Sequence, residues 1–179
     1  METNSSDLHV TDPIISIGTM AEKLGISVSA IRKYEAMGLI IPYRSESGHR
    51  LFSVEDIERI RKILYLIQER GLNIKGIRSI QAFMPCWKLL PCTLKKWKQC
   101  PGYTDNKNPC WTKKGVACIK QGNECRLCQV YRFGTLHIKE IKNLAYHDAQ
   151  DKKSDAGIDK LLEKYKLKST DKKSNKKEK

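Results

Sequence analysis

The first strongly patterned stretch of the chain begins with GTMAEKLG, in which apolar residues recur every three or four positions. Met20, Ala21 and Leu24 fall on one face of a helix expected over about 18–24. Gly25 is the residue at which this helix should end, because glycine readily adopts the left-handed conformation that closes a helix. The pattern therefore predicts a short amphipathic helix followed by a tight turn.

A second helix is predicted directly after the turn, from about 28 to 37, with Ser27 as its N-cap. Ala21, Gly25 and Ile31 are separated by four and six residues. At this spacing a helix-turn-helix has a small residue where the helices touch, a glycine in the turn and a branched apolar residue on the second helix. An ordinary helical hairpin has the same pattern, so the spacing alone leaves both structures open.

The pattern after the second helix predicts a wing and two further helices. LIIPYRSESGHRLF has apolar ends around a polar centre, the composition of two short strands joined by a turn. SVED then predicts a third helix, in which Ser53 caps the N-terminus and Asp56 reaches back in a capping box. That helix is expected to end at Gly71, and a fourth to run from Asn73 until Pro85.

This order of elements, carried by IGTMAEKLGISVSAIRKYEAMGLI, YRSESGHRLF and SVEDIERIRKI, resembles the MerR family of winged-helix transcription regulators. The resemblance spans residues 15–80. It rests on an apolar-Arg-any-Tyr-Glu pattern at 31–35 and on the wing pattern Arg-any-Glu-Ser-Gly-any-Arg-Leu-Phe at 44–52. It implies a winged helix-turn-helix domain of four helices plus a two-stranded wing, which binds double-stranded promoter DNA.

The DNA contacts that the resemblance implies come from the second helix and the wing. The helix would lie in the major groove, and the wing would reach the backbone or an adjacent minor groove. Tyr34 would donate its hydroxyl to a phosphate, although Tyr34 and Phe52 have an alternative role in sealing the edge of the core. Arginines beside a Ser-Gly turn have no core to serve. The candidate DNA-binding residues are Ser29, Arg32, Lys33, Tyr34, Arg44, His49 and Arg50.

MerR-like proteins act as homodimers on a dyad inside an overlong promoter spacer. They twist or bend the DNA so that RNA polymerase can read both promoter elements, which is control through DNA shape. The resemblance therefore implies a homodimer that affects RNA polymerase through the promoter. The family also has a long dimerisation helix, whereas here the fourth helix is followed by MPCWKLLPC with no long heptad seam. The resemblance does not predict how this chain dimerises.

The charge of the chain agrees with a polyanionic partner. It has 34 Lys and Arg against 20 Asp and Glu, a formal net charge of +14, which favours nucleic acid or an acidic membrane face over a neutral ligand. No segment is apolar for long enough to cross a bilayer, and the N-terminus does not have the pattern of a signal peptide. We therefore expect a cytoplasmic protein without a membrane partner, whose thiols stay reduced.

All seven cysteines fall in one stretch of the chain. PCW occurs at 85–87 and again at 109–111, each time followed within eight residues by another cysteine, which indicates an imperfect duplication. Cys125 and Cys128 form the one CxxC pair, a spacing that lets both sulfurs face one centre. In a reducing compartment such a cluster favours metal or redox chemistry over disulfides. The candidate metal ligands are Cys86, Cys92, Cys100, Cys110, Cys118, Cys125 and Cys128.

Residues 86–131 resemble a module with two Cys-Trp motifs found in bacterial signalling proteins. The resemblance implies a sensor of redox state or of a soft metal, and thiolates select an iron–sulfur cluster or zinc over calcium or magnesium. The compact cysteine run of redox-sensing MerR proteins is not present. Three alternatives stay open: a structural zinc or cluster knot in a constitutive DNA binder, buried free cysteines, and a thiol oxidoreductase that uses the CxxC pair.

The sequence thus predicts a mainly α-helical protein with a winged helix-turn-helix domain, a small irregular cysteine-rich module and a C-terminal helix. No residue set suggests a catalytic acid, base and nucleophile, so we expect a non-enzyme. The expected segments are a disordered lead-in at 1–13, a DNA-binding domain at 14–84, a cysteine-rich module at 85–133, a helix at 134–149 able to pair across a dimer, and a basic, largely disordered tail at 150–179.

Overall fold

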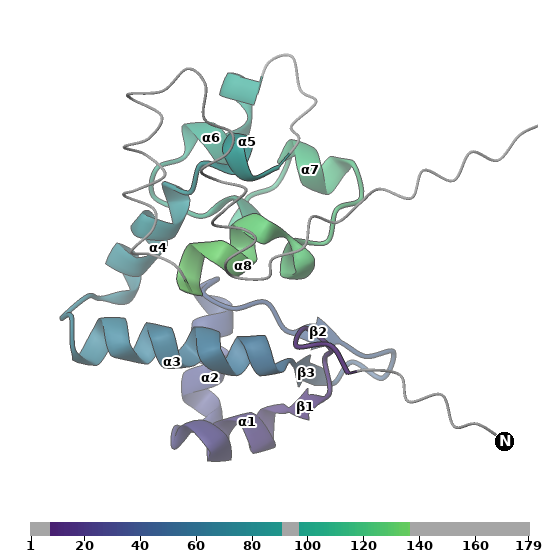
Figure 1. Cartoon of the computed structure of the whole chain (residues 1–179), viewed down its shortest axis with the longest axis vertical. Coiled ribbons are helices and arrows are strands. Elements are labelled where there is room, and N and C mark those ends of the chain that lie inside the picture. The colour runs from purple at the N-terminus through teal and green to yellow at the C-terminus, as the bar shows by residue number, and fades with distance from the viewer. Residues whose placement is uncertain (1–7, 91–96, 137–179) are drawn as a thin grey trace, which may run out of the picture.

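The structure is a computed structural model that describes residues 8–90 and 97–136. It is mainly helical, with one small sheet near the N-terminus and a series of short helices in the cysteine-rich segment (Figure 1). In Figure 1 the helix-turn-helix and the sheet form the lower part of the molecule, α3 (Val54–Gln68) lies across its middle, and the cysteine-rich segment lies above α3. The predicted tail at 150–179 lies outside the described residues.

The helix-turn-helix consists of α1 (Ile17–Leu24) and α2 (Val28–Ala36). Ser16 and Ser27 cap the two N-termini with side-chain oxygens that accept hydrogen bonds from backbone N–H groups. Gly25 ends α1 with a φ of 62°, a conformation that glycine adopts without steric cost. The predicted ends of both helices are confirmed to within one residue.

The wing is confirmed as two antiparallel strands, β2 (Tyr43–Arg44) and β3 (Arg50–Phe52). A third strand that the sequence analysis missed, β1 (Ile15–Ser16), pairs with the other edge of β3, so the strand order is β1-β3-β2. Ile15 lies opposite Phe52, which connects the start of the helix-turn-helix directly to the base of the wing.

The two following helices have the predicted caps. Ser53 and Asp56 form the capping box of α3, and Asn73 caps α4 (Ile74–Ala82). Helices α1 to α4 and strand β3 enclose the core of the N-terminal half, which buries apolar side chains from every one of these elements. The fully buried members of this core are Met20, Ile31, Leu39, Phe52, Ile60, Ile63 and Ile77.

The cysteine-rich segment is irregular, as predicted, and consists of single helical turns followed by one longer helix, α8 (Gln129–Leu136). The helix predicted at 134–149 overlaps the end of α8, and its residues beyond 136 lie outside the described part of the chain. The short turns are α5 (Cys86–Leu89), η1 (Trp97–Gln99), α6 (Pro101–Thr104), η2 (Cys110–Thr112), α7 (Ala117–Lys120) and η3 (Cys125–Leu127).

A second apolar cluster holds the cysteine-rich segment together. Met84 and Leu89 pack with Val130 and Phe133 of α8, and Trp111 lies against this group. Helix α8 also packs along α3 (Figure 1). The two segments that the sequence divides are therefore in direct contact. Among the described helices, none combines the length and the hydropathy that a membrane crossing requires.

Candidate nucleic-acid interface and cysteine-rich module

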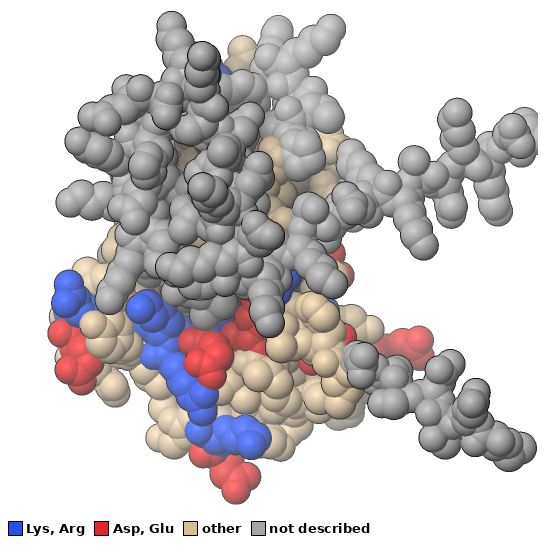
Figure 2. Space-filling view, viewed as in Figure 1, with Lys and Arg blue, Asp and Glu red and all other residues tan. Residues whose placement is uncertain are grey.

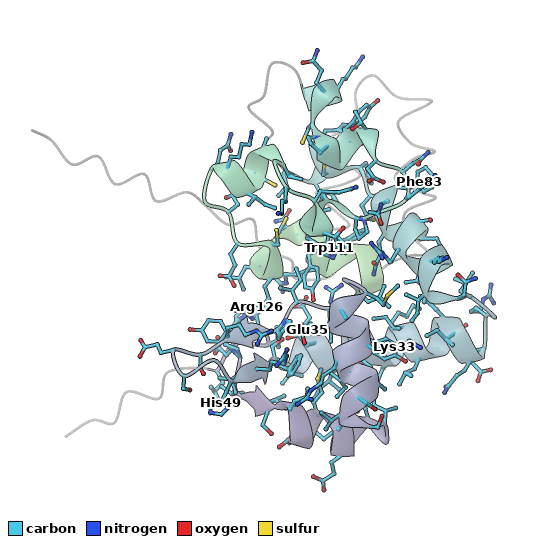
Figure 3. All side chains as sticks on the ribbon, turned by 180° about the vertical axis from the view of Figure 1, so that it is seen from behind. Lys33, Glu35, His49, Phe83, Trp111 and Arg126 are labelled. Atoms are coloured by element: carbon cyan, nitrogen blue, oxygen red, sulfur yellow. The ribbon has the colours of Figure 1, made fainter. Side chains whose placement is uncertain are left out.

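The recognition helix α2 presents one polar face to solvent. Ser29, Arg32 and Lys33 are all exposed, and their spacing of three and four residues places them side by side on the helix. Figure 3, seen from behind, shows Lys33 on α2 with the wing on the opposite side of the helix. An exposed helix carrying two cations and a hydroxyl has the size and the chemistry needed to enter a major groove.

Tyr34 points into the molecule, unlike these three neighbours. Its side chain is 8% exposed and belongs to the core of the N-terminal half, and burial raises its pKa above 10.0. The alternative role of Tyr34 at the edge of the core is thus confirmed, and that of Phe52 likewise, since Phe52 is fully buried. A contact between the Tyr34 hydroxyl and a phosphate stays a prediction.

The two wing arginines are held by a carboxylate of the recognition helix. Glu35 accepts from Nη2 of Arg44 at 2.7 Å and from Nε of Arg50 at 2.6 Å, while its own side chain is 17% exposed. The two arginines thus have an ion-pair partner on α2 that the sequence analysis did not identify. They orient the wing against α2, and with 51% and 30% of their side chains exposed they remain open to a phosphate.

Sequence reasoning missed Glu35 as a functional residue, although it closes the Arg-any-Tyr-Glu pattern on which the family resemblance rests. The signal was the presence of one carboxylate among the cations of the recognition helix. A lone acid on a surface that faces DNA is costly unless it neutralises a neighbouring cation. Its partners lie nine and fifteen residues away, so only the folded chain identifies them.

His49 lies at the exposed tip of the wing. The Ser45 oxygen accepts from the Gly48 N–H at 2.8 Å, and the Ser45 N–H donates to the His49 oxygen at 3.0 Å, which closes the turn. Gly48 has a φ of 81°, as a hairpin turn of this kind requires. Figure 3 shows His49 on the wing, with α2 between it and Lys33. The predicted contacts thus form two separate groups, one on α2 and one on the wing.

The charge on the opposite face is mixed. Figure 2 shows Lys and Arg side chains of the helix-turn-helix half interspersed with Asp and Glu on the face that presents α3. Within α3, Arg61 pairs with Glu58 one turn earlier. Neighbouring charges of opposite sign partly cancel each other's field, so the described part of this face is less attractive to nucleic acid than a surface of cations alone.

Six of the seven cysteines lie among the described residues, and all six are free thiols that are partly exposed. Cys92 lies outside the described residues. Cys86, Cys110 and Cys125 each begin a single helical turn and Cys100 caps one, whereas Cys118 is the second residue of α7 and Cys128 follows η3. Cys86, Cys110 and Cys128 also pack against the second apolar cluster. Both PCW motifs thus place their cysteine at the start of a helical turn, and the duplication itself stays a prediction.

Burial shapes the chemistry of these thiols. It raises the pKa of Cys110 well above its ordinary value, and the nearby thiols of Cys86, Cys118, Cys125 and Cys128 raise it further. Burial also raises the pKa of Cys128, and that of Cys125 to about 11. Without a bound cation these thiols are neutral at pH 7, the opposite of the lowered pKa that a catalytic nucleophile needs.

The described thiols are close enough to influence one another, yet the described residues contain no group of three or more Cys, His, Asp or Glu arranged to hold a metal ion. Thiols release their protons when they bind a soft cation, and the charge of the cation offsets the cost of burying the thiolates. The chemistry of the donors fits zinc or an iron–sulfur cluster, while the choice of ligands stays a prediction.

Hydrogen bonds and an ion pair connect the cysteine-rich segment to α3, with side chains contributed by both. Nη2 of Arg59 donates to the backbone oxygen of Tyr131 at 2.7 Å. Arg132 forms a two-pronged ion pair with Glu55, with Nη2 to Oε2 at 2.7 Å and Nε to Oε1 at 3.0 Å. Both side chains of this pair are 11% exposed. A bidentate pair removed from solvent fixes orientation, so α8 is held in one register on α3.

Comparison with known proteins identifies the N-terminal segment. The model of MerR HTH family regulatory proteins matches residues 15–83. Heat shock protein HspR of Streptomyces coelicolor is 32% identical over 77 residues, 43% of this chain and 51% of that protein. The transcriptional regulator GlnR of Bacillus cereus is 34% identical over 68 residues, 38% of this chain and 52% of GlnR.

A mercuric resistance operon regulatory protein of Bacillus cereus is 39% identical over 65 residues, 36% of this chain and 48% of that protein. The chain thus spans about half the length of the curated relatives it matches. None of these names describes an enzyme, in line with the expectation from the sequence. The family match ends at residue 83, so the resemblance of residues 86–131 to the two-Cys-Trp module stays a prediction. Residues 15–83, which contain the two helices and the wing described above, are therefore a helix-turn-helix domain of the MerR family.

Proposed function

We propose that this chain is a sequence-specific transcription regulator of the MerR type, which acts in the cytoplasm as a homodimer on double-stranded promoter DNA. One observation carries the proposal: α2 exposes Ser29, Arg32 and Lys33 next to a wing whose arginines are oriented by Glu35. In such an arrangement the helix reads base edges in the major groove and the wing anchors the flanking phosphates. The dimer reaches RNA polymerase by changing the shape of the promoter.

A binding measurement with charge-matched variants tests DNA recognition. The full chain first selects its preferred duplex from a random-sequence library, and affinity is then measured for that duplex and a scrambled one. Arg32→Ala is expected to weaken binding to the selected duplex by about tenfold or more, because a base or phosphate contact is lost. Lys120→Ala removes the same charge from the exposed surface of α7 and is expected to leave affinity within about twofold. Equal losses for the two variants would show that only net charge matters.

We infer in addition that the cysteine-rich module senses redox state or a soft metal. Three thiols pack against the apolar cluster that includes residues of α8, and α8 packs along α3. This arrangement supports the role, because a change at the thiols is transmitted through close-packed side chains. Metal, iron and acid-labile sulfide are measured on protein purified without oxygen, together with its visible absorption. The inference requires that oxidation or metal exchange reversibly change transcription from the selected promoter while the protein stays folded.

The burial of Arg59 and Tyr131 at the contact favours a second candidate, a structural knot that completes a constitutive DNA-binding domain. In that case metal sets folding and not signalling, so chelation unfolds the protein and transcription changes only with that unfolding. A thiol oxidoreductase is disfavoured, since burial raises the pKa of both thiols in the CxxC pair.

A further inference from the structure

Residues 38–43, called the connector below, join the recognition helix to the wing and are bonded to the cysteine-rich module. Nε1 of Trp111 donates to the Gly38 oxygen at 2.8 Å, directly after α2. Farther along, the Ile41 N–H donates to the Tyr131 hydroxyl at 2.9 Å. The rings of Trp111 and Tyr131 pack edge to face, 5.1 Å apart, so the two bonds come from one aromatic unit.

A third contact reaches the far end of the connector. The guanidinium of Arg126 lies 5.6 Å from the centroid of the Tyr43 ring on β2. Nη1 of Arg126 also donates to the Thr11 oxygen at 2.7 Å, and the residue is only 9% exposed. Figure 3 shows Arg126 beside the wing and Trp111 on the module side of α2. Since Arg126 lies inside the CxxC pair, that pair is fixed to the wing by its own intervening residue.

The first copy of the duplicated motif contains the same aromatic pair in a different setting. Trp87 and Tyr103 pack edge to face at 4.9 Å, and Tyr103 is 39% exposed. Tyr131, its counterpart three residues after a cysteine in the second copy, is 2% exposed. In the second copy the aromatic pair thus contacts the DNA-binding domain and its tyrosine is buried there, which a role in the module alone does not require.

We propose that Trp111, Tyr131 and Arg126 are positioning residues for DNA binding, which fix the wing relative to the recognition helix and link that geometry to the cysteines beside them. The proposal rests on the proposed function as a DNA-binding regulator. The connector sets the distance between α2 and the wing, because its two ends are the end of one and the start of the other. Bonds to its backbone at Gly38 and Ile41 restrict that distance regardless of the connector's own side chains.

Conservative variants of the full chain test the proposal. Trp111→Phe and Tyr131→Phe each keep a ring and remove one hydrogen-bonding group, while Trp87→Phe and Tyr103→Phe make the same changes in the first copy. The probe is a 30-base-pair duplex carrying the selected sequence, with a scrambled duplex beside it. Each second-copy variant is expected to weaken specific binding about threefold to tenfold, as loss of one hydrogen bond predicts. The first-copy variants are expected to stay within about twofold.

The salt dependence separates positioning from stability. A displaced wing gives up phosphate contacts, so the slope of log affinity against log salt is expected to fall by about one per contact in the second-copy variants. A variant that is only less stable loses active protein, which leaves this slope unchanged. Wild-type slope and affinity in Trp111→Phe and Tyr131→Phe would overturn the proposal. If the wild-type chain itself does not distinguish the two duplexes, the proposed function fails first, and the two failures are distinct.

Discussion

The guanidinium carbon of Arg59 lies 3.6 Å from the centroid of the Tyr131 ring, and the same arginine donates to the backbone oxygen of Tyr131. Arg59 belongs to α3 of the MerR-type domain, and Tyr131 belongs to α8 of the cysteine-rich module. Their exposed fractions are 0% and 2%. Burying a charge is costly unless it is paired or hydrogen-bonded. The cysteine-rich module thus supplies contacts that the buried arginine of α3 requires. The two segments share one folding unit.

Truncating this ring is expected to destabilise the whole protein. Tyr131→Ala should lower the free energy of unfolding by about 3–5 kcal/mol, since it opens a cavity and removes the ring from a buried arginine. Urea denaturation of the full chain measures the change. Tyr103→Ala, which removes the half-exposed ring of the first copy, should cost about 1 kcal/mol. Equal costs would mean that the Arg59–Tyr131 contact contributes little.

The helices of the DNA-binding half could be predicted because their signals are local. Ser27 caps α2, Asn73 caps α4, and the capping box of Ser53 and Asp56 lies within one turn of α3. The apolar period of the same segments then identifies their buried faces. Chemistry that spans a few residues is visible in the sequence, so these elements and the wing were placed correctly.

What the sequence analysis missed depends on contacts between distant residues. Strand β1 has two residues, and only its pairing with β3 defines it. In the sequence Glu35 has no neighbouring partner, and only folding of the wing places Arg44 and Arg50 beside it. Tyr34 lies within a motif that is predicted to contact DNA, yet its ring turns into the core. In each case the structure depends on tertiary packing, because local sequence propensity does not distinguish between the alternatives.

The packing of the cysteine-rich module against α3 could not be predicted from the sequence either. The sequence predicts a helix at 134–149, whereas α8 begins at Gln129. Val130 and Phe133 of α8 bury themselves against residues about forty positions earlier, which no window of the sequence reveals. The cysteines dominate the composition of the segment and suggest an autonomous knot. The structure instead shows a module whose helix α8 contributes to the module's own apolar cluster and also packs along α3.

Glu35→Ala is expected to reduce the specificity of DNA binding. Loss of the carboxylate frees Arg44 and Arg50, so affinity for the selected duplex should fall while affinity for a scrambled duplex rises with the added positive charge. Electrophoretic mobility shifts with both duplexes measure the ratio. Glu58→Ala makes the same charge change on α3, where Glu58 pairs with Arg61, and should raise both affinities slightly. A ratio that changes equally in the two variants would assign the effect to charge alone.

Gly38→Ala tests the approach of the module to the end of the recognition helix. Gly38 has a φ of 70°, and a methyl group on it would collide with Cγ2 of Thr112. The variant should be less stable to unfolding by about 1 kcal/mol because of backbone strain, and by a further 1–3 kcal/mol because of overpacking. Gly48→Ala, at φ 81° with open space around it, isolates the backbone cost.

Removing the Thr112 methyl group should recover part of that loss. Thr112→Ser keeps the hydroxyl that donates to the Pro109 oxygen, so the double variant with Gly38→Ala relieves the collision while retaining the turn. Urea denaturation of the two single variants and the double variant measures the coupling energy. A coupling near zero would show that the module does not pack against Gly38 in solution.

Alkaline pH should destabilise the wild-type protein more than Tyr131→Phe. Burial raises the pKa of Tyr131 from 10.0 to about 12, with Arg59 opposing the shift, so between these values the unfolded chain binds fewer protons than the folded one. The stabilisation is complete below pH 10, declines as the pH rises and is lost through pH 12, and its upper limit is about 2–3 kcal/mol. Urea denaturation at pH 9 and pH 11 in a reducing buffer gives the difference between wild type and variant, in which other titrating groups cancel. Parallel curves for wild type and Tyr131→Phe would mean that this hydroxyl is open to water.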